Sequence, residues 1–238
     1  MDIQPVERTA VSDEVLGKLV AEILSGRLAP GDPLPAEREL ALRFGVNRHA
    51  IREALKGIRQ AGLVRIAQGG KTRVLDWRRH AGLDVLSALA ATGAVPPVEL
   101  LRDIVEMRRS VATDAARLCA ERATEAQCAA ILEAARGYPV ADATIAITVA
   151  ADEVFWTAVI EGSRNLAYRL GLNTLLAGFD AIGIGALADL GLMAEFVDRD
   201  AHLELAERIA ARDADGATRL ADELLGRIVT LLAGAAEH

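Results

Sequence analysis

The feature that most constrains this chain is its order of residues from 30 to 74, which reads PGDPLPAERELALRFGVNRHAIREALKGIRQAGLVRIAQGGKTRV. A turn rich in proline and glycine comes first, and a short segment with helical periodicity then ends at Gly45. A second helical segment, rich in arginine, follows and stops at Ala61-Gly62. Two short apolar segments then flank Gly69-Gly70. This order predicts a helix-turn-helix followed by a β-hairpin wing.

Positive charge is concentrated in the same segment. Between residues 38 and 73 there are nine basic residues and two acids, Glu39 and Glu53, so the segment carries +7. The basic residues are Arg38, Arg43, Arg48, Arg52, Lys56, Arg59, Arg65, Lys71 and Arg73. Because the whole chain carries −7, all other residues together carry −14. A local positive surface on an acidic protein is what phosphate binding requires, since neutralising phosphates releases counterions.

Two arginines of the second helical segment are predicted to read DNA bases. Arg48 and Arg52 lie one helical turn apart, so they project from the same face. A planar guanidinium can donate two hydrogen bonds to O6 and N7 of guanine, the commonest specific base contact. Arg38, at the start of the preceding helix, is expected near the same groove edge. The alternative is that these arginines form surface ion pairs, but acidic partners are nearly absent from this helix and the wing.

Further DNA contacts are expected at the start of this helix and at the tip of the wing. Asn47 and His49 stand at the helix N-terminus, where base-edge and phosphate contacts are made. Asn47 is also the expected cap of the helix. Gln68, Gly69 and Lys71 stand at the wing tip, where a glycine lets the backbone approach a minor groove.

After Trp77 the pattern changes to successive segments with helical periodicity. The expected helices are 80–91, 97–121, 124–136, 141–161, 164–183, 193–211 and 214–234. The sequence thus predicts a mainly α protein, with a winged helix-turn-helix domain at 1–77 and an antiparallel all-α bundle of six to seven helices at 78–238. Charge divides in the same way, with +2 on residues 1–76 and −9 on residues 77–238.

Bulk composition excludes a membrane protein. No apolar run reaches the roughly 18 residues that a membrane-spanning helix needs. The N-terminal residues MDIQPVERTA lack the basic-then-apolar order of a signal peptide. We therefore expect a cytoplasmic protein with no membrane partner. Cys119 and Cys128 lie in helical-looking sequence and are expected to be buried, unpaired side chains.

Residues at fixed spacings carry a family resemblance. They are Pro30-Gly31-Asp32-x-Leu34-Pro35-x-Glu37-Arg38-x-Leu40-Ala41, Gly45-Val46-x-Arg48, Arg52-Glu53-Ala54-Leu55, Gly62-Leu63-Val64 and Gly69. This pattern resembles the winged-helix domain of GntR-type bacterial transcription regulators. The resemblance implies that Arg38, Arg48 and Arg52 read bases and that Gly69 lies at the wing tip. Asn47 stands where the family usually has Ser or Thr, and its amide can cap a helix equally well.

The helical remainder resembles the FadR-type effector domain (FCD domain) of the same regulators. Residues 106–124 are similar to the signature helix of that domain. Asp152-x-x-Phe155 followed by Ser163-x-Asn165 is similar to its middle signature, and residues 82–86 resemble the acyl-CoA-responsive branch. The resemblance implies an effector-binding and dimerisation domain.

Many members of this family bind a divalent metal through an Asp, a His one turn later, and two further His about 22 residues apart. Asp152 and His202 stand at two of these positions. Trp156 replaces the helical His, and Leu224 stands 22 residues after His202. We therefore expect no metal cofactor and regard Asp152 and His202 as a degenerate remnant. A metal-dependent sensor of a small organic acid is the alternative.

Trp156 and Leu224 would make the effector pocket more apolar, which favours an effector with a hydrocarbon portion because each buried methylene contributes about 0.8 kcal/mol. Arg108 is the expected anchor for its carboxylate, thioester or phosphate end. Alternatively, Arg108 pairs with Asp152 or Glu106 inside the bundle. We expect a fatty acid or acyl-CoA effector. The predicted effector-binding residues are Arg108, Asp152, Trp156, His202 and Leu224.

These features predict a homodimeric regulator of double-stranded, palindromic operator DNA. Repression relieved by the effector is the expectation, and activation is the alternative. An enzyme is disfavoured, and no catalytic residue is assigned. Gly183-Ile184-Gly185-x-x-Ala188 fits a loose dinucleotide pattern, but no strand precedes it, so an interhelical loop is expected. A protein that merely coats DNA would not need an acidic domain of this size.

Overall fold

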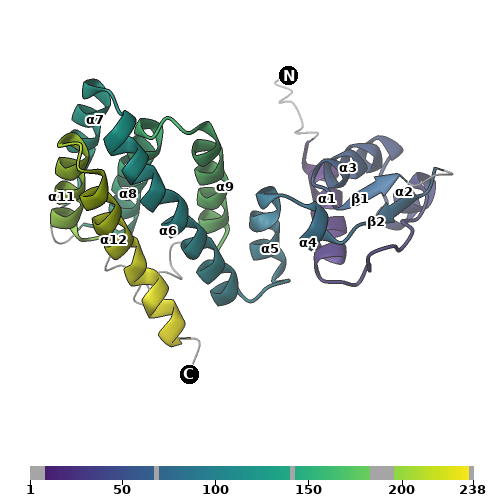
Figure 1. The fold of residues 1–238 in the computed structure, drawn as a ribbon. Coiled ribbons are helices and arrows are strands. Elements are labelled where there is room, and N and C mark those ends of the chain that lie inside the picture. The colour runs from purple at the N-terminus through teal and green to yellow at the C-terminus, as the bar shows by residue number, and fades with distance from the viewer. Residues whose placement is uncertain (1–8, 67–69, 140–142, 183–195, 236–238) are drawn as a thin grey trace, which may run out of the picture. The chain divides into compact units, whose positions relative to one another are not determined.

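The computed structural model describes residues 9–66, 70–139, 143–182 and 196–235, and Figure 1 shows their elements. The chain divides into two compact units, Met1–Val95 and Pro96–His238. The described residues are mainly helical and include one two-stranded sheet. The expectation of a mainly α fold with a small β-hairpin is confirmed.

Three helices and two strands form the helix-turn-helix and its wing in the first unit. They are α1 (Thr9–Leu24), α2 (Glu37–Phe44), α3 (Arg48–Gln60), β1 (Val64–Ile66) and β2 (Thr72–Val74). The strands pair antiparallel, with Val64 opposite Val74. Helix α3 packs against α1 and α2. Its inner face, with Ile51, Ala54 and Ile58, is buried, so its arginine-rich face is left exposed to solvent.

Local chemistry sets the ends of α2 and α3. Helix α2 ends at Gly45, whose φ of 67° is a left-handed conformation that glycine adopts without strain. The Asn47 side chain then accepts a hydrogen bond from the backbone N–H of Ala50 at 2.9 Å, which caps α3. Gly62 follows α3 with a φ of 71°, and a Cβ there would lie 2.4 Å from the carbonyl oxygen of His80. The predicted cap and both glycine stops are confirmed.

The single helix expected at 80–91 is wrong. The chain instead forms α4 (Trp77–His80), a 3-10 turn η1 (Leu83–Val85) and α5 (Leu86–Thr92). Ala81 and Gly82 lie between α4 and η1. They are extended, with ψ angles of 157° and −172°, and cannot continue a helix. Helix α5 packs against α1. The first compact unit runs to Val95.

Six helices make up the described part of the second unit. They are α6 (Pro97–Arg122), α7 (Glu125–Arg136), α8 (Ile145–Gly162), α9 (Leu166–Ile182), α11 (Arg199–Ala210) and α12 (Ala214–Ala235). Helix α6 packs against α8, α9, α11 and α12, and α12 runs alongside it (Figure 1). Helices α8 and α11 begin later than expected because the Thr144 and Asp198 side chains cap them. The pattern around Gly183 to Ala188 lies outside the described residues.

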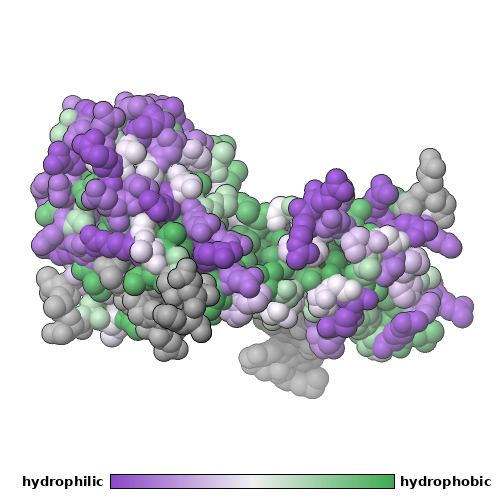
Figure 2. All heavy atoms as spheres, turned by 60° about the horizontal axis from the view of Figure 1, so that its bottom comes forward, coloured by the Kyte–Doolittle hydropathy of each residue, from purple (hydrophilic) through white to green (hydrophobic). Residues whose placement is uncertain are grey.

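Small side chains build the core of the bundle. Alanines from α6, α11 and α12 are fully buried there, together with Phe155 and Trp156 of α8. Cys119 and Cys128 are buried and not disulfide-bonded, as expected. Short side chains let helix axes approach closely, which suits a chain with only 3% aromatic residues. Hydrophilic side chains cover much of the face of each unit shown in Figure 2.

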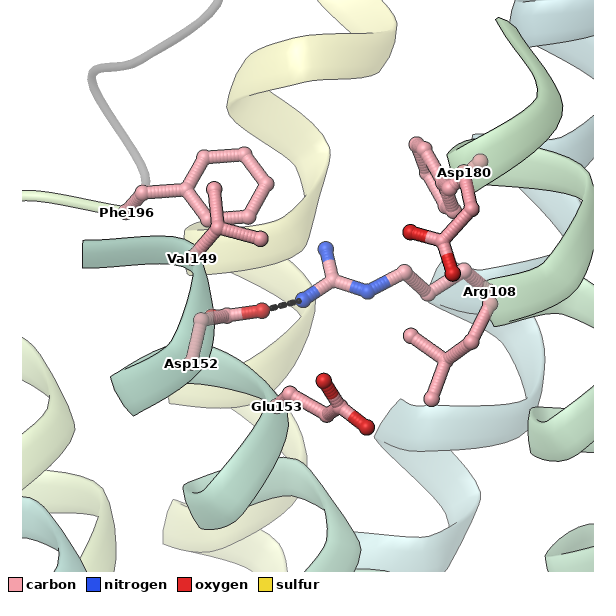
Figure 3. A pocket seen from close by; sticks show the side chains of 8 residues that line it. Arg108, Val149, Asp152, Glu153, Asp180 and Phe196 are labelled. Carbon is pink, nitrogen blue, oxygen red and sulfur yellow. Dashed lines mark hydrogen bonds and ion pairs between the residues drawn. The ribbon is translucent and has the colours of Figure 1, made fainter. Parts of the chain in front are cut away.

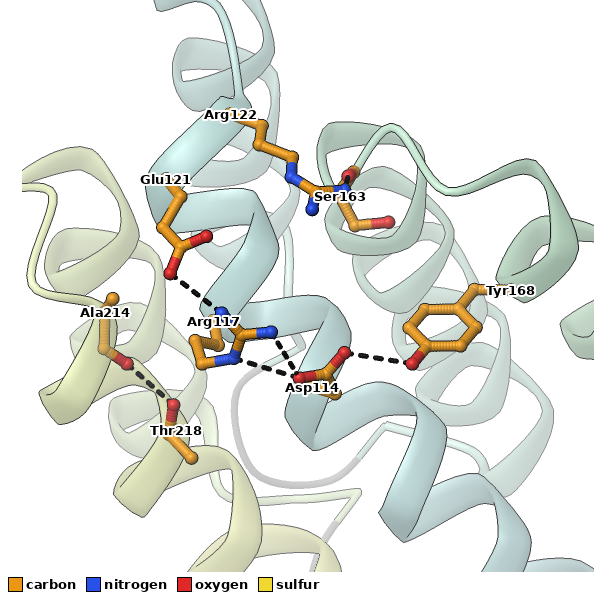
Figure 4. Close-up of polar contacts among 8 residues, drawn as sticks. All are labelled: Asp114, Arg117, Glu121, Arg122, Ser163, Tyr168, Ala214 and Thr218. Atoms are coloured by element: carbon orange, nitrogen blue, oxygen red, sulfur yellow. Dashed lines mark hydrogen bonds and ion pairs between the residues drawn. The ribbon is translucent and has the colours of Figure 1, made fainter.

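A polar network joins α9 to the outside of α6 (Figure 4). The Tyr168 hydroxyl donates to Oδ2 of Asp114 at 2.9 Å. Arg117 donates to Oδ1 of the same carboxylate at 2.8 Å and to Glu121 at 2.8 Å. Partial burial raises the pKa of Asp114, but hydrogen bonds from Arg117 and Tyr168 outweigh it and hold the pKa below its ordinary value. The network therefore keeps Asp114 ionised where it holds α9.

Two helical glycines of the bundle provide a matched test of its packing. A Cβ at Gly162 would lie 2.4 Å from the Cys119 sulfur, whereas a Cβ at Gly171 would meet nothing within 4 Å. Gly162→Ala should lower the free energy of unfolding by about 1–3 kcal/mol through overpacking. Gly171→Ala should raise it by about 0.4–1 kcal/mol, because the unfolded chain loses freedom. Urea unfolding followed by circular dichroism measures both, and equal stabilities of the two variants would contradict this packing.

Candidate functional site

The outer face of α3 presents the residues expected to contact DNA. Arg48 and His49 in its first turn are exposed, and so is Arg38 in the first turn of α2. Within the described part of the chain, neither Arg38 nor Arg48 has an ion-pair or hydrogen-bond partner. Their guanidinium groups can therefore bind phosphates or base edges without breaking a contact within the protein.

Arg52 differs from the other two arginines. Its Nε donates to Oε2 of Glu37 at 2.8 Å, across the gap between α3 and the first turn of α2. Glu37 lies fifteen residues earlier in the chain, just before the basic segment begins. The expectation that acidic partners are nearly absent thus missed this one, because the sequence does not show which residue of α2 faces α3.

The wing adds further cations. Arg65 of β1 and Arg73 of β2 are directly opposite each other, and both are exposed. Like charges at opposed strand positions are destabilising, so this pairing favours an anion between or beside them. Arg73 also donates to the carbonyl oxygen of Gly31 at 2.7 Å. Lys71 is exposed as expected, while Gln68 and Gly69 lie outside the described residues.

A small cavity lies in the second unit beside Arg108 (Figure 3). Its volume is about 50 Å³. Its lining residues are Arg108, Val149, Asp152, Glu153, Leu176, Phe179, Asp180 and Phe196. Nη2 of Arg108 donates to Oδ2 of Asp152 at 2.8 Å, and both side chains are buried. The internal pair with Asp152 that was considered for Arg108 is therefore present.

Asp152 is the centre of a buried polar cluster. Its other oxygen, Oδ1, accepts a hydrogen bond from the Tyr138 hydroxyl at 3.0 Å and lies 3.6 Å from Nε2 of His202. Nδ1 of His202 lies 2.7 Å from the backbone oxygen of Asp198, to which it donates. Burial alone would raise the pKa of Asp152, but Arg108, His202 and Tyr138 together hold it below its ordinary value. Asp152 is therefore an anion inside the bundle.

The predicted effector residues separate into two groups. Arg108 and Asp152 line the cavity. Trp156, His202 and Leu224 are fully or almost fully buried in the described bundle core and do not line it. Trp156 instead has its ring centroid 5.6 Å from Cζ of Arg108. It contributes to the surroundings of the guanidinium and not to the cavity wall.

Sequence reasoning missed the apolar wall of the cavity. Val149, Leu176, Phe179 and Phe196 form this wall and come from α8, α9 and the segment before α11. Two of them are phenylalanines in a chain that has only four. Because phenylalanines are so scarce, their positions could have indicated where the cavity lies. Large rings between the helices of an alanine-rich bundle can leave space that small side chains do not fill.

The donor set does not fit a divalent metal. No group of three His, Cys, Asp or Glu side chains that could hold a metal exists among the described residues. Asp152 is already bound to Arg108, and His202 is the only imidazole beside it in this part of the chain. An arginine cation thus compensates the carboxylate that would otherwise face a metal.

Comparison with known proteins identifies the family. Residues 11–74 match the family "Bacterial regulatory proteins, gntR family", and residues 103–227 match the FCD domain. The chain belongs to the GntR family of bacterial transcription regulators. It combines a DNA-binding helix-turn-helix with an effector-binding FCD domain, and this family consists of regulators and not of enzymes.

Relatives are similar along most of the chain. HTH-type transcriptional regulator Mce2R of Mycobacterium tuberculosis is 34% identical over 94% of this chain and 92% of its own length. The "Fatty acid metabolism regulator protein" of Cronobacter sakazakii is 29% identical over 64% of this chain and 67% of its own. The structure of Lar, which controls the Listeria monocytogenes agr system, has a similar fold. Its TM-score is 0.59 at 14% identity, with 98% of this chain and 99% of Lar covered. None of the helices described in this regulator is long and apolar enough to cross a bilayer.

The buried Arg108–Asp152 pair can be tested by removing its charge. Asp152→Asn should lower the free energy of unfolding by about 3 kcal/mol, because the buried guanidinium loses this carboxylate. The full difference in the free energy of unfolding between this variant and the wild type should be present above pH 3.8, the ordinary pKa of aspartate. It should shrink as the pH falls through the lower pKa of the folded state, where Asp152 itself becomes neutral.

Glu153→Gln is the matched control, because Glu153 is the next residue of α8 and is exposed. It should change the stability by no more than about 0.5 kcal/mol. Urea unfolding between pH 3 and pH 7 measures both variants. Equal effects at the two positions, or a difference that does not depend on pH, would contradict the assignment of a buried ion pair.

Proposed function

We propose that this regulator is a cytoplasmic repressor that binds a palindromic operator as a homodimer and releases it when an acyl or carboxylate effector occupies the cavity beside Arg108. The observation that carries the DNA-binding part is Arg48 in the first turn of α3, which is exposed and has no partner among the residues that the structure describes. Arg38, Arg48 and Arg52 are the proposed base readers. Asn47, His49, Gln68, Gly69 and Lys71 are proposed to position the protein on the duplex.

The two-fold arrangement follows from the way one recognition helix reads DNA. A single α3 contacts only a few base pairs. A second copy is therefore expected to be needed to distinguish one operator from the many competing sites in a genome. Two copies related by a two-fold axis would place their α3 helices on half-sites about 34 Å apart, one turn of DNA. An isologous dimer and a palindromic operator each have a two-fold axis, so their symmetries match.

The chemistry of the cavity supports an effector with an anionic end and a hydrocarbon portion. Arg108 supplies a guanidinium, and the four apolar side chains of the wall would cover methylene groups. The relative from Cronobacter sakazakii that is named for fatty acid metabolism is in keeping with an acyl group. Glu153 and Asp180 also line the cavity and would oppose an anion, so the anionic end is proposed to lie at the Arg108 guanidinium.

The size of the cavity suggests how binding could change the bundle. Pockets that hold small-molecule ligands enclose about 300–1,000 Å³, so a cavity of about 50 Å³ would have to enlarge to take an acyl chain. An anion would also compete with Asp152 for Arg108. Effector binding is therefore proposed to move α8 and α9 relative to α6. To weaken DNA binding, the effector must prefer the arrangement that binds DNA poorly.

Substitution of Arg48 tests the proposed reading helix. Arg48→Ala should lower operator affinity by about 5- to 150-fold, since a bidentate guanine contact contributes about 1–3 kcal/mol. Dimerisation and effector binding should be unchanged. Fluorescence anisotropy with an operator selected by the wild-type protein, together with analytical ultracentrifugation, provides the measurement.

Arg136→Ala is a suitable control, because Arg136 is an exposed arginine of α7 whose side chain pairs with Glu133 of the same helix and lies in the other unit. It should leave operator affinity unchanged. If Arg48→Ala binds the operator as tightly as this control does, α3 is not the reading helix.

Thermal shift tests the effector. A saturating acyl-CoA or fatty acid should stabilise the protein, by about 2.7 kcal/mol at a concentration 100 times its Kd. Phe179→Trp should reduce the shift by filling the cavity, whereas Phe44→Trp in the DNA-binding unit should not. Stabilisation by small dicarboxylates with Ni²⁺ or Zn²⁺, and none by acyl ligands, would overturn the acyl effector.

A further inference from the structure

The three arginines proposed to read bases are held differently. Arg38 and Arg48 have no partner in the part of the chain that the structure describes, whereas Nε of Arg52 donates to Glu37 at 2.8 Å. Both side chains of this pair are exposed, with 64% of the Arg52 side chain and 40% of the Glu37 side chain accessible. Exposed ion pairs contribute little to stability. The main effect of this ion pair is therefore on the orientation of the Arg52 side chain.

Glu37 lies in a groove whose other charged lining residues are all cationic. The groove has a volume of about 140 Å³ and runs between α3 and the wing strands. Arg52, Lys56 and Arg59 line it from α3, and Glu37 is the sole acid among its described lining residues. A carboxylate at this place is repelled by any phosphate that the three cations attract.

Stabilisation of α2 does not explain what distinguishes Glu37 from the other acid in the same turn. An acid in the first turn of a helix is favourable because the helix N-terminus carries partial positive charge. Glu39 lies in the same first turn and provides this interaction as well, while pairing with Arg43 away from α3. Only Glu37 reaches a residue of the recognition helix, so its distinguishing contact is the one with Arg52.

The contact leaves the guanine-reading end of Arg52 available. A guanidinium has five N–H donors, and Glu37 engages the one on Nε. The two terminal nitrogens remain to donate side by side to O6 and N7 of a guanine. A carboxylate bound at Nε also restricts rotation of the side chain, so less conformational freedom is lost when the base is bound.

We infer that Glu37 is a positioning residue that orients Arg52 toward one base pair of each operator half-site and thereby sets DNA specificity. This inference rests on the proposed function, because it requires that the protein read a defined operator. Glu37 lowers general affinity for DNA by its charge and raises discrimination between sequences by its contact. The two effects have opposite signs and can be measured separately.

Glu37→Gln and Glu39→Gln form a matched pair for the test. Each removes one negative charge from the first turn of α2 and one exposed ion pair. Full-length wild type, both variants and Arg52→Gln would each be used to select from a pool of random duplex DNA, followed by sequencing. Affinity for a duplex that the wild type does not select would be measured by anisotropy in parallel.

Glu37→Gln should lose about tenfold in base preference at one position of each half-site, the same position at which Arg52→Gln loses it. Its affinity for the unselected duplex should rise, because a charge that repels phosphate is gone. Glu39→Gln should show this rise without any change in base preference.

Three results would overturn the inference. They are an unchanged preference in Glu37→Gln, a uniform loss at every position, or a loss at a position that Arg52 does not read. The last would mean that Glu37 contacts a base itself. Failure of the wild type to select any sequence would instead contradict the proposed function, so the two failures are distinguishable.

Discussion

The helical unit depends on one buried charge pair, Arg108 with Asp152. Burying two charges is costly unless each is compensated, and here the carboxylate also accepts from Tyr138 and faces His202. The cluster continues through Asp198, which binds His202 by its backbone and Arg227 by its side chain at 2.6 Å. Helices α6, α8, α11 and α12 therefore meet in one polar chain. A ligand that drew the Arg108 guanidinium away from Asp152 would disturb this chain of contacts, which is in keeping with the proposed effector site.

Arginine has opposite uses in the two units. In the bundle, Arg108 is buried and paired with Asp152, so its charge is compensated within the protein. On α3 and the wing arginine is exposed, and Arg65 and Arg73 even face each other across the sheet. Such repulsion lowers the stability of the isolated unit and is relieved when phosphates approach. The acidic remainder of the chain balances this charge and leaves the whole protein at −7.

Motif and periodicity predicted the DNA-binding unit well, because its turns depend on local chemistry. Gly45, Asn47 and Gly62 act through their own backbone angles or hydrogen bonds to neighbours. The helix expected at 80–91 was wrong for the opposite reason. Ala81 and Gly82, at the start of that range, are extended, so its larger apolar residues belong to the shorter elements η1 and α5. In the bundle the pair of Arg108 and Asp152 was among the alternatives, but the wall formed with Phe179 and Phe196 was not foreseen.

The sequence alone determined the helix-turn-helix with its wing, the basic segment, the helical bundle and the family, because these depend on short spacings and on local preferences. Tertiary structure decided which distant side chains meet. Glu37 reaches Arg52 across the turn, Asp152 compensates Arg108 across two helices, and Trp156 and Leu224 fill the core and do not line the cavity. The direction of a side chain around a packed helix depends on its neighbours from other segments. Residue spacing within one segment does not contain that information.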